Sequence, residues 1–92
     1  MSTFIVTFEL IQPALNQERL LQRIRAYPSW ARVSLVSYLI LTPETVVQVR
    51  DQLVGFLKPG DKLFVGNCPV PSAWHGQPED VSKWILENQP KA

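Results

Sequence analysis

The segment from Thr3 to Ile11 constrains the fold of this chain more than any other, because its side chains alternate as a β-strand requires. Alternation divides the segment into two faces: Phe4, Val6, Phe8 and Leu10 on one, and Ile5, Thr7, Glu9 and Ile11 on the other. Glu9 is the charged residue of this run. A charge within a strand costs free energy unless it is solvated, paired or bound to a metal. Glu9 is therefore the best single clue to a functional site.

The composition indicates one globular domain. A chain of 92 residues has room for one hydrophobic core, so we expect residues 1–92 to fold as a single domain. The hydrophobic content of 46% is typical of globular proteins. The formal net charge of +1 argues against a strongly basic nucleic-acid coat but allows a local basic face.

Cysteine use and hydropathy indicate the compartment. The chain has one cysteine, Cys68, which cannot form an internal disulfide, and it offers no set of Cys and His residues for zinc. No basic and apolar leader follows the initial Met-Ser-Thr, and no apolar stretch approaches about 18 residues. We therefore expect a cytoplasmic protein without membrane contact.

Proline residues mark the limits of the first strand and of the helix after it. Pro13 should end the strand, Asn16 can cap the helix, and Pro28 should stop it. Between these limits, apolar residues recur at helical spacing: Leu20, Leu21, Ile24 and Tyr27. The following stretch is β-branched and is interrupted by Ser34 and Ser37. It predicts two strands, Trp30–Leu35 and Val36–Leu41, joined by a tight turn.

In the second half of the chain, capping residues, prolines and glycines again mark where helices and strands begin and end. The run Thr42-Pro43-Glu44 predicts a helix start, with a hydroxyl cap and a proline in the first turn, and Lys58-Pro59-Gly60 predicts its end. A strand over Lys62–Cys68 and an irregular loop over Asn67–Gly76 should follow. A short last helix opens at Pro78.

This order of elements predicts the ferredoxin-like α+β fold, a βαββαβ core with two helices on one face of an antiparallel sheet, followed by a short C-terminal helix. Phe4, Val6 and Phe8 should lie beneath the two helices. Ile5 and Ile11, on the open face, are too apolar for a fully hydrated surface, so a partner or an added element must cover that face. We expect a homodimer formed through it.

The order of several short motifs resembles a known group of proteins. Phe8-Glu9 before a Pro-containing turn, together with the βαββαβ order, resembles the small-subunit family of CRISPR adaptation. The chain is more similar still to small, mostly uncharacterised bacterial and phage proteins that genomes label SinR-like. The shared pattern spans nearly the whole chain: Thr7-Phe8-Glu9-Leu10, Trp30-Ala31-Arg32, Val49-Arg50-Asp51, Asp61-Lys62-Leu63 and Ala73-Trp74-His75-Gly76.

The resemblance implies a ferredoxin-fold homodimer. In the adaptation family, an aspartate at the position of Glu9 lies near the two-fold axis and has been proposed to bind a divalent metal for nucleic-acid cleavage. Other members bind DNA as scaffolds without cutting it. This chain has glutamate there, one methylene longer. The resemblance points to Glu9 as a catalytic and metal-binding residue shared across the dimer, with Mg²⁺ or Mn²⁺ as the ion. It predicts that Glu9→Gln abolishes cutting and leaves the fold intact.

Two explanations of Glu9 stay open from the residues alone. Metal-assisted phosphodiester hydrolysis needs carboxylates around the ion, so Glu9 of two protomers would have to meet. Two such carboxylates raise one pKa unless a cation lies between them. In the alternative, Glu9 is solvated at the strand end or paired with an arginine such as Arg32.

Residues 19–32 contain four arginines and no carboxylate: Arg19, Arg23, Arg25 and Arg32. Guanidinium groups bind phosphate in a bidentate manner, so Arg19, Arg23 and Arg32 are candidate nucleic-acid contacts. Arg19 and Arg23 lie one helical turn apart, whereas Arg25 points elsewhere. The alternative is a solvated helix face with one further charge at a strand end.

The remaining candidates have simpler structural explanations. Trp30, Trp74 and Trp84 could stack on bases, but we expect all three to pack within the protein. His75 would need a nearby acid or nucleophile to act as a base, and the sequence places none there. Cys68 is predicted to end a buried strand as a small apolar residue.

Together these features predict a dimeric nucleic-acid-associated protein, with a metal-dependent nuclease as its catalytic version. The competing interpretation is a non-catalytic dimeric module that binds a protein partner. The low net charge and the lack of a second acid beside Glu9 favour that alternative. A small-ligand sensor at the dimer interface is a third class, supported only by the versatility of the fold.

Overall fold

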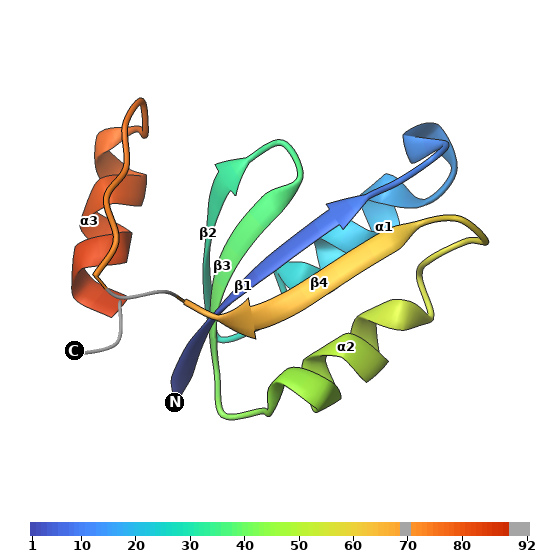
Figure 1. Ribbon diagram of the computed structural model, residues 1–92, viewed down its shortest axis with the longest axis horizontal. Helices are drawn as coiled ribbons and strands as arrows, with labels where there is room; N and C mark the ends of the chain where they lie inside the picture. Colours follow the sequence, from blue (N-terminus) through green and yellow to red (C-terminus); the bar gives the residue numbers. More distant parts are fainter. Residues whose placement is uncertain (69–70, 89–92) are drawn as a thin grey trace.

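The computed structural model describes residues 1–68 and 71–88 and has the predicted βαββαβ order with a C-terminal helix. The elements are β1 (Ser2–Glu9), α1 (Pro13–Ile24), β2 (Ser29–Ser34), β3 (Ser37–Thr42), α2 (Val46–Val54), β4 (Lys62–Asn67) and α3 (Glu79–Asn88). Helices α1 and α2 pack against one face of the sheet, while α3 lies beside the edge strand β2 (Figure 1). The ferredoxin-like α+β fold is confirmed.

The sheet has four antiparallel strands in the order β2-β3-β1-β4, so β1 is central and β2 and β4 are the edges. In the register, Thr7 lies between Ser37 of β3 and Phe64 of β4. Glu9 lies opposite Lys62. Because paired residues share a face and the period along a strand is two, these five side chains all lie on the face away from α1 and α2.

The two predicted strands between residues 30 and 41 are confirmed, with each boundary shifted by one position. Leu35 and Val36 form the turn between them instead of ending the strands. The turn is closed by the Val36 N–H, which donates to Ser34 Oγ at 3.2 Å. The Leu35 side chain is 78% exposed, so the turn holds an apolar residue in solvent that the hydropathy pattern assigned to a strand.

The predicted inner face of the first strand is confirmed. Phe4, Val6 and Phe8 are buried in the main core beneath α1 and α2. The helices and β3 complete this core with seven further buried residues: Leu20, Leu21, Ile24, Tyr38, Ile40, Val49 and Leu53. Tyr27 is buried as predicted, although α1 ends before it, at Ile24.

The prediction that Asn16 caps the first helix is wrong. β1 ends at Glu9, earlier than expected, and α1 begins at Pro13, whose fixed φ suits the first helical position. Asn16 therefore lies inside the first turns of α1, where it is buried. Its Nδ2 donates to Phe56 O at 2.8 Å and to Asp61 Oδ2 at 3.0 Å. Hydrogen bonds to residues far away in the sequence thus explain why a polar asparagine is buried at this position.

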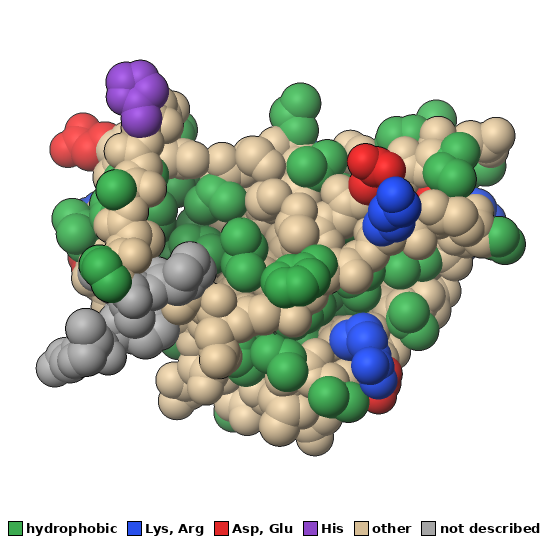
Figure 2. All heavy atoms as spheres, in the orientation of Figure 1, with side chains coloured by type: hydrophobic (Ala, Val, Ile, Leu, Met, Phe, Trp, Pro, Cys, Tyr) green, Lys and Arg blue, Asp and Glu red, His purple; other side chains and the backbone are tan. Residues whose placement is uncertain are grey.

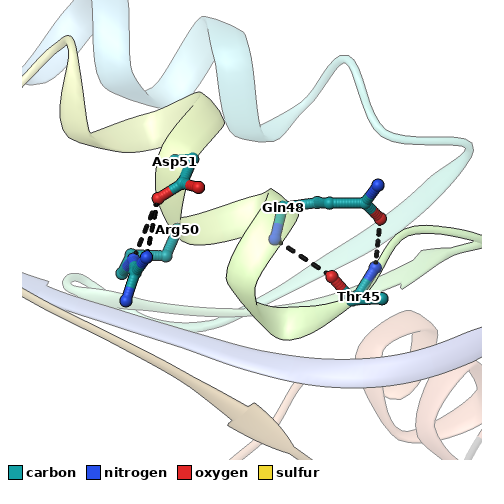
Figure 3. Close-up of polar contacts among 4 residues, drawn as sticks. All are labelled: Thr45, Gln48, Arg50 and Asp51. Carbon is teal, nitrogen blue, oxygen red and sulfur yellow. Dashed lines mark hydrogen bonds and ion pairs between the residues drawn. The ribbon is translucent and has the colours of Figure 1, made fainter.

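The predicted cap of the second helix is also wrong, because α2 begins after Thr45 and not after Thr42. Gln48 N donates to Thr45 Oγ1 at 3.1 Å, and Thr45 N donates to Gln48 Oε1 at 2.8 Å (Figure 3). Only Thr45 has a glutamine three residues later, which completes a capping box. Thr42 is buried at the end of β3, where its hydroxyl accepts from Glu44 N.

Helix α2 also ends earlier than predicted, at Val54 rather than near Lys58–Gly60. Phe56 and Leu57 still pack against the main core from the turn that follows. Gly60 belongs to the turn before β4 and has φ +89°, in the left-handed region that favours glycine. The glycine and proline signals therefore mark the entry into β4 and not the end of the helix.

Helix α3 is the added element that covers part of the open face. Ile85 of α3 is buried in a second cluster with Leu39 and Cys68, and Ile5 packs against the same cluster. Trp84 joins it and its Nε1 donates to Ser29 Oγ at 2.7 Å. Ile5 is therefore partly covered by an added element of the chain itself, which is one of the two kinds of cover predicted for this face.

Candidate nucleic-acid interface

Two of the predicted site residues, Glu9 and Arg32, lie on opposite faces of the sheet. Glu9 shares the open face with Lys62. Arg32 lies opposite Tyr38, which is buried on the other face, toward α1 and α2. The hypothesis that Glu9 pairs with Arg32 is therefore wrong, since a strand pairing sends the two side chains to opposite sides.

Glu9 lies at the end of β1 with its side chain 77% exposed. Its Oε1 lies 3.9 Å from the Nζ of Lys62, a pair in open solvent that contributes little free energy. Glu9 in the structure is therefore solvated at the end of the strand, as the alternative explanation expects. In residues 1–68 and 71–88 no group of three or more His, Cys, Asp and Glu side chains is arranged to hold a metal ion. One protomer supplies Glu9 alone beside an ammonium group, which does not by itself fit a divalent ion.

An arginine–aromatic cluster of Arg25, Trp30, Arg32 and Tyr38 lies where β2 and β3 meet the end of α1. The Arg25 Cζ is 5.3 Å from the centroid of the Trp30 ring and 5.9 Å from that of Tyr38. The Arg32 Cζ is 5.6 Å from the Tyr38 centroid. Two guanidinium groups therefore contact the same Tyr38 ring. Trp30 remains 38% exposed.

The cluster is held in place by hydrogen bonds to uncharged groups. Arg25 Nη2 donates to Tyr38 Oη at 3.0 Å. Arg32 donates from Nε to Ser34 O at 3.2 Å and from Nη2 to Leu35 O at 2.8 Å, which ties it to the β2–β3 turn. Since each guanidinium has five N–H groups, most of the donors remain for a ligand.

No carboxylate of the described residues forms an ion pair with Arg25 or Arg32. The ion pairs there join Arg50 to Asp51, Lys62 to Glu9 and Lys83 to Glu87. Figure 3 shows the first of these on α2. Within the described residues the two positive charges of the cluster therefore have no ion-pair partner, which favours the binding of an anion.

The other two predicted arginines lie outside this cluster. Arg23 Nη2 donates to Gln52 Oε1 at 3.1 Å, and its Cζ lies 4.7 Å from the ring centroid of Tyr27. Tyr27 Oη donates to the same Gln52 oxygen at 2.7 Å, and burial raises the pKa of Tyr27. Arg23 thus serves the contact between α1 and α2, and Arg19 is an exposed residue of α1.

Arg25 was not among the candidate contacts predicted from the sequence, because it does not lie on the same face of the helix as Arg19 and Arg23. The residue follows the last position of α1, and its side chain turns toward β2 and β3. The signal was the pair of aromatic residues, Trp30 and Tyr38, which offer guanidinium groups a stacking surface.

Trp74 and Cys68 pack within the protein, as predicted, whereas Trp30, which was also expected to pack, is 38% exposed. Trp74 packs against the second cluster, and its Nε1 donates to Ser82 Oγ at 3.0 Å. Cys68 is buried, and burial raises the pKa of its thiol, which opposes a thiolate role. His75 is exposed.

Asp61 was also missed, although it organises the loop before β4. Its carboxylate accepts from Ile11 N at 2.9 Å, from Lys58 N at 2.9 Å and from Asn16 Nδ2 at 3.0 Å. These hydrogen bonds, the Ile11 one foremost, hold the pKa of Asp61 below its usual value of 3.8. The residue therefore ties the ends of β1, α1 and β4 together.

Because the folded pKa of Asp61 is lowered, its charged form stabilises the fold above the unfolded pKa, and this stability is lost as the pH falls through the folded pKa. We expect Asp61→Asn to lower the urea midpoint at pH 7 and to match the wild type at acid pH below the folded pKa. Urea unfolding at several pH values measures this, with Asp51→Asn as the control. A constant gap across the whole pH range would contradict this role of Asp61.

Comparisons with known proteins add no further constraint. No family model, curated protein or solved structure matches this chain. The resemblance to the adaptation and SinR-like proteins therefore remains a prediction from the motifs. Among the described residues, no helix is long and apolar enough to cross a membrane.

Proposed function

We propose that this chain is a nucleic-acid-associated protein that binds the phosphate backbone through Arg25 and Arg32. The observation that supports this most is the pair of guanidinium groups over the Tyr38 ring, which form no ion pair with a described carboxylate. Desolvating a charge beside a like charge is unfavourable, so such a pair favours an anionic ligand. A phosphodiester chain presents anions at regular spacing to both groups.

The arrangement of the cluster favours phosphate further. Hydrogen bonds to Ser34 O and Leu35 O fix the direction of Arg32, and the Tyr38 hydroxyl fixes that of Arg25. Groups that are already ordered lose less entropy when a ligand binds. The exposed indole of Trp30 beside them adds an aromatic surface that a base can contact.

We also propose that the protein is a homodimer through the part of the open face that α3 leaves uncovered. Figure 2 shows hydrophobic side chains near the middle of the molecule in this view, with few charges among them. Phe64, on the open face, is 62% exposed, and Val36, in the turn between β2 and β3, is 43% exposed. A shallow hollow of about 260 Å³ lies beside them, between Thr7 and the Glu9–Lys62 pair.

The charges at the end of this face would suit a symmetric contact with a second copy. Glu9 and Lys62 lie side by side, so a two-fold axis nearby would bring the acid of one protomer to the base of the other. The two Phe64 rings would gain cover in the same contact. Metal-dependent cutting by a Glu9 pair would need the two acids to meet instead, with both ammonium groups displaced, and we therefore propose binding rather than cleavage.

The test compares a double variant that removes both arginines of the cluster with a single variant that removes an arginine outside it. Arg25→Ala/Arg32→Ala should weaken binding to a labelled oligonucleotide by about tenfold or more at low salt, since two charge-assisted contacts are removed. On a single strand it should also reduce the slope of log affinity against log salt concentration by about 1.4, which is about 0.7 for each lost phosphate contact. Fluorescence anisotropy measures both quantities.

The control is Arg50→Ala, which removes an exposed guanidinium that already pairs with Asp51 at 2.9 Å. It should leave affinity and salt slope near the wild-type values. If Arg50→Ala lost half as much binding free energy as the double variant, binding would follow net charge and not the cluster. A wild type that binds no nucleic acid at low salt would remove the proposal and favour a dimeric module for a protein partner.

A further inference from the structure

A hollow of about 360 Å³ lies between the edge strand β2 and helix α3, next to the arginine–aromatic cluster. Six residues line it: Trp30, Ala31, Arg32, Asp80, Val81 and Trp84. Its volume lies within the range of about 300–1,000 Å³ that small-molecule sites occupy. Trp30 and Arg32 belong to both the hollow and the cluster, so a ligand in the hollow would lie beside the proposed phosphate contacts.

The walls of the hollow combine flat apolar surfaces with a few polar groups. Trp30 of the edge strand β2 and Trp84 of α3 are the aromatic residues of the lining. Asp80 offers a carboxylate acceptor and Arg32 offers donors. β2 has no strand on its outer side, so half of its backbone N–H and C=O groups point away from the sheet at this edge.

Both indoles are held in place before any ligand arrives. Trp84 Nε1 donates to Ser29 Oγ at 2.7 Å, and Trp84 packs in the second cluster. Trp30 contacts the Arg25 guanidinium and lies 5.8 Å from the Tyr38 ring, centroid to centroid. Ordered aromatic walls lower the entropy that binding costs.

We infer that this hollow binds one unpaired nucleobase, so that the protein prefers single-stranded nucleic acid to a duplex. This inference rests on the proposed function, because Arg25 and Arg32 would bind the phosphates on either side. A base inside a duplex is stacked on both faces and cannot reach the indoles. The Asp80 carboxylate would repel a phosphate at the far wall but accepts an N–H from the edge of a base.

The experiment uses the full chain and labelled oligonucleotides of one length, single-stranded and duplex, of DNA and of RNA. We expect the wild type to bind the single strand about tenfold more tightly than the duplex, since stacking of a base on an aromatic side chain is worth such a factor. Trp30→Leu should lose this preference and keep the salt dependence that the arginines give. Trp74→Leu, at a tryptophan outside the hollow, is the matched control.

A second measurement leaves the protein unchanged, in case Trp30→Leu does not fold. An oligonucleotide with abasic sites keeps every phosphate and lacks bases, so it should bind the wild type about tenfold more weakly than the intact strand. Competition by a free mononucleotide would show that the base site also accepts a monomer, whereas competition by oligonucleotides alone would restrict it to the polymer.

Equal affinity for single strand, duplex and abasic strand, with a steep salt dependence, would overturn this inference and leave the proposed function standing. Absence of salt-dependent binding to every substrate would remove both. The two failures are thus distinguishable in one set of titrations.

Discussion

Replacing Phe64 with aspartate is expected to abolish the proposed dimer. Phe64 is 62% exposed on the open face and lies beside the Glu9–Lys62 pair. Burying an uncompensated carboxylate in each protomer costs several kcal/mol, so the dimer dissociation constant should rise roughly 100-fold or more. The side chain lies on an edge strand outside the core, which should leave the fold of the monomer intact.

Sedimentation over a range of protein concentrations measures this effect. The matched control is Leu15→Asp, which changes another exposed apolar residue, 58% exposed on α1. An acid in the first turns of a helix is tolerated well, so this variant should dimerise as the wild type does. A wild-type monomer, or an unchanged Phe64→Asp dimer, would contradict dimerisation through the open face.

The second large effect concerns Tyr38, which is fully buried and supports both the core and the arginine–aromatic cluster. Tyr38→Ala should lower the free energy of unfolding by about 3–5 kcal/mol, because an aromatic ring leaves a cavity when it is removed. Tyr38→Phe keeps the ring and removes only the hydroxyl that accepts from Arg25. That change should cost about 0.5–1.5 kcal/mol.

Urea unfolding of the two variants separates these contributions. Tyr38→Phe should keep the core and release Arg25, so that binding of the oligonucleotide weakens while the denaturant slope is unchanged. Similar stability losses in both variants would contradict this division, because they would place the main contribution in the hydroxyl and not in the ring.

The main parts of the fold were predictable from the sequence because each rests on a local pattern. Strict alternation around Val6 defined the central strand and its buried face, and the serines at positions 34 and 37 marked the hairpin. These signals work because side-chain period and turn chemistry act over a few residues.

Helix boundaries were harder to predict because several residues nearby could serve as caps. Asn16 has the right side chain for a cap, yet its hydrogen bonds to Phe56 and Asp61, from distant parts of the chain, place it inside α1. Thr42 and Thr45 both carry a hydroxyl, and the partner Gln48 decided between them. Contacts between residues far apart in sequence are not visible in local spacing.

The candidate site was predictable only in part. Arg32 was singled out from the sequence and lies over the Tyr38 ring, whereas Arg25 and its contact with Tyr38 depend on how the end of α1 meets the sheet. The separation of Glu9 from Arg32 follows from the strand register, which one residue of shift would have reversed. The sequence can therefore suggest which residues belong to a site, but it does not predict which of them lie close together when they come from different elements.

The most direct test of the central claim is the affinity of the wild-type protein for a labelled single-stranded oligonucleotide at several salt concentrations, without divalent ions. If Arg25 and Arg32 bind phosphates, the logarithm of the affinity should fall against the logarithm of the salt concentration with a slope of about −1.4 or steeper, the value for two contacts on a single strand. A flat dependence, or no binding at the lowest salt, would contradict a nucleic-acid interface at this cluster.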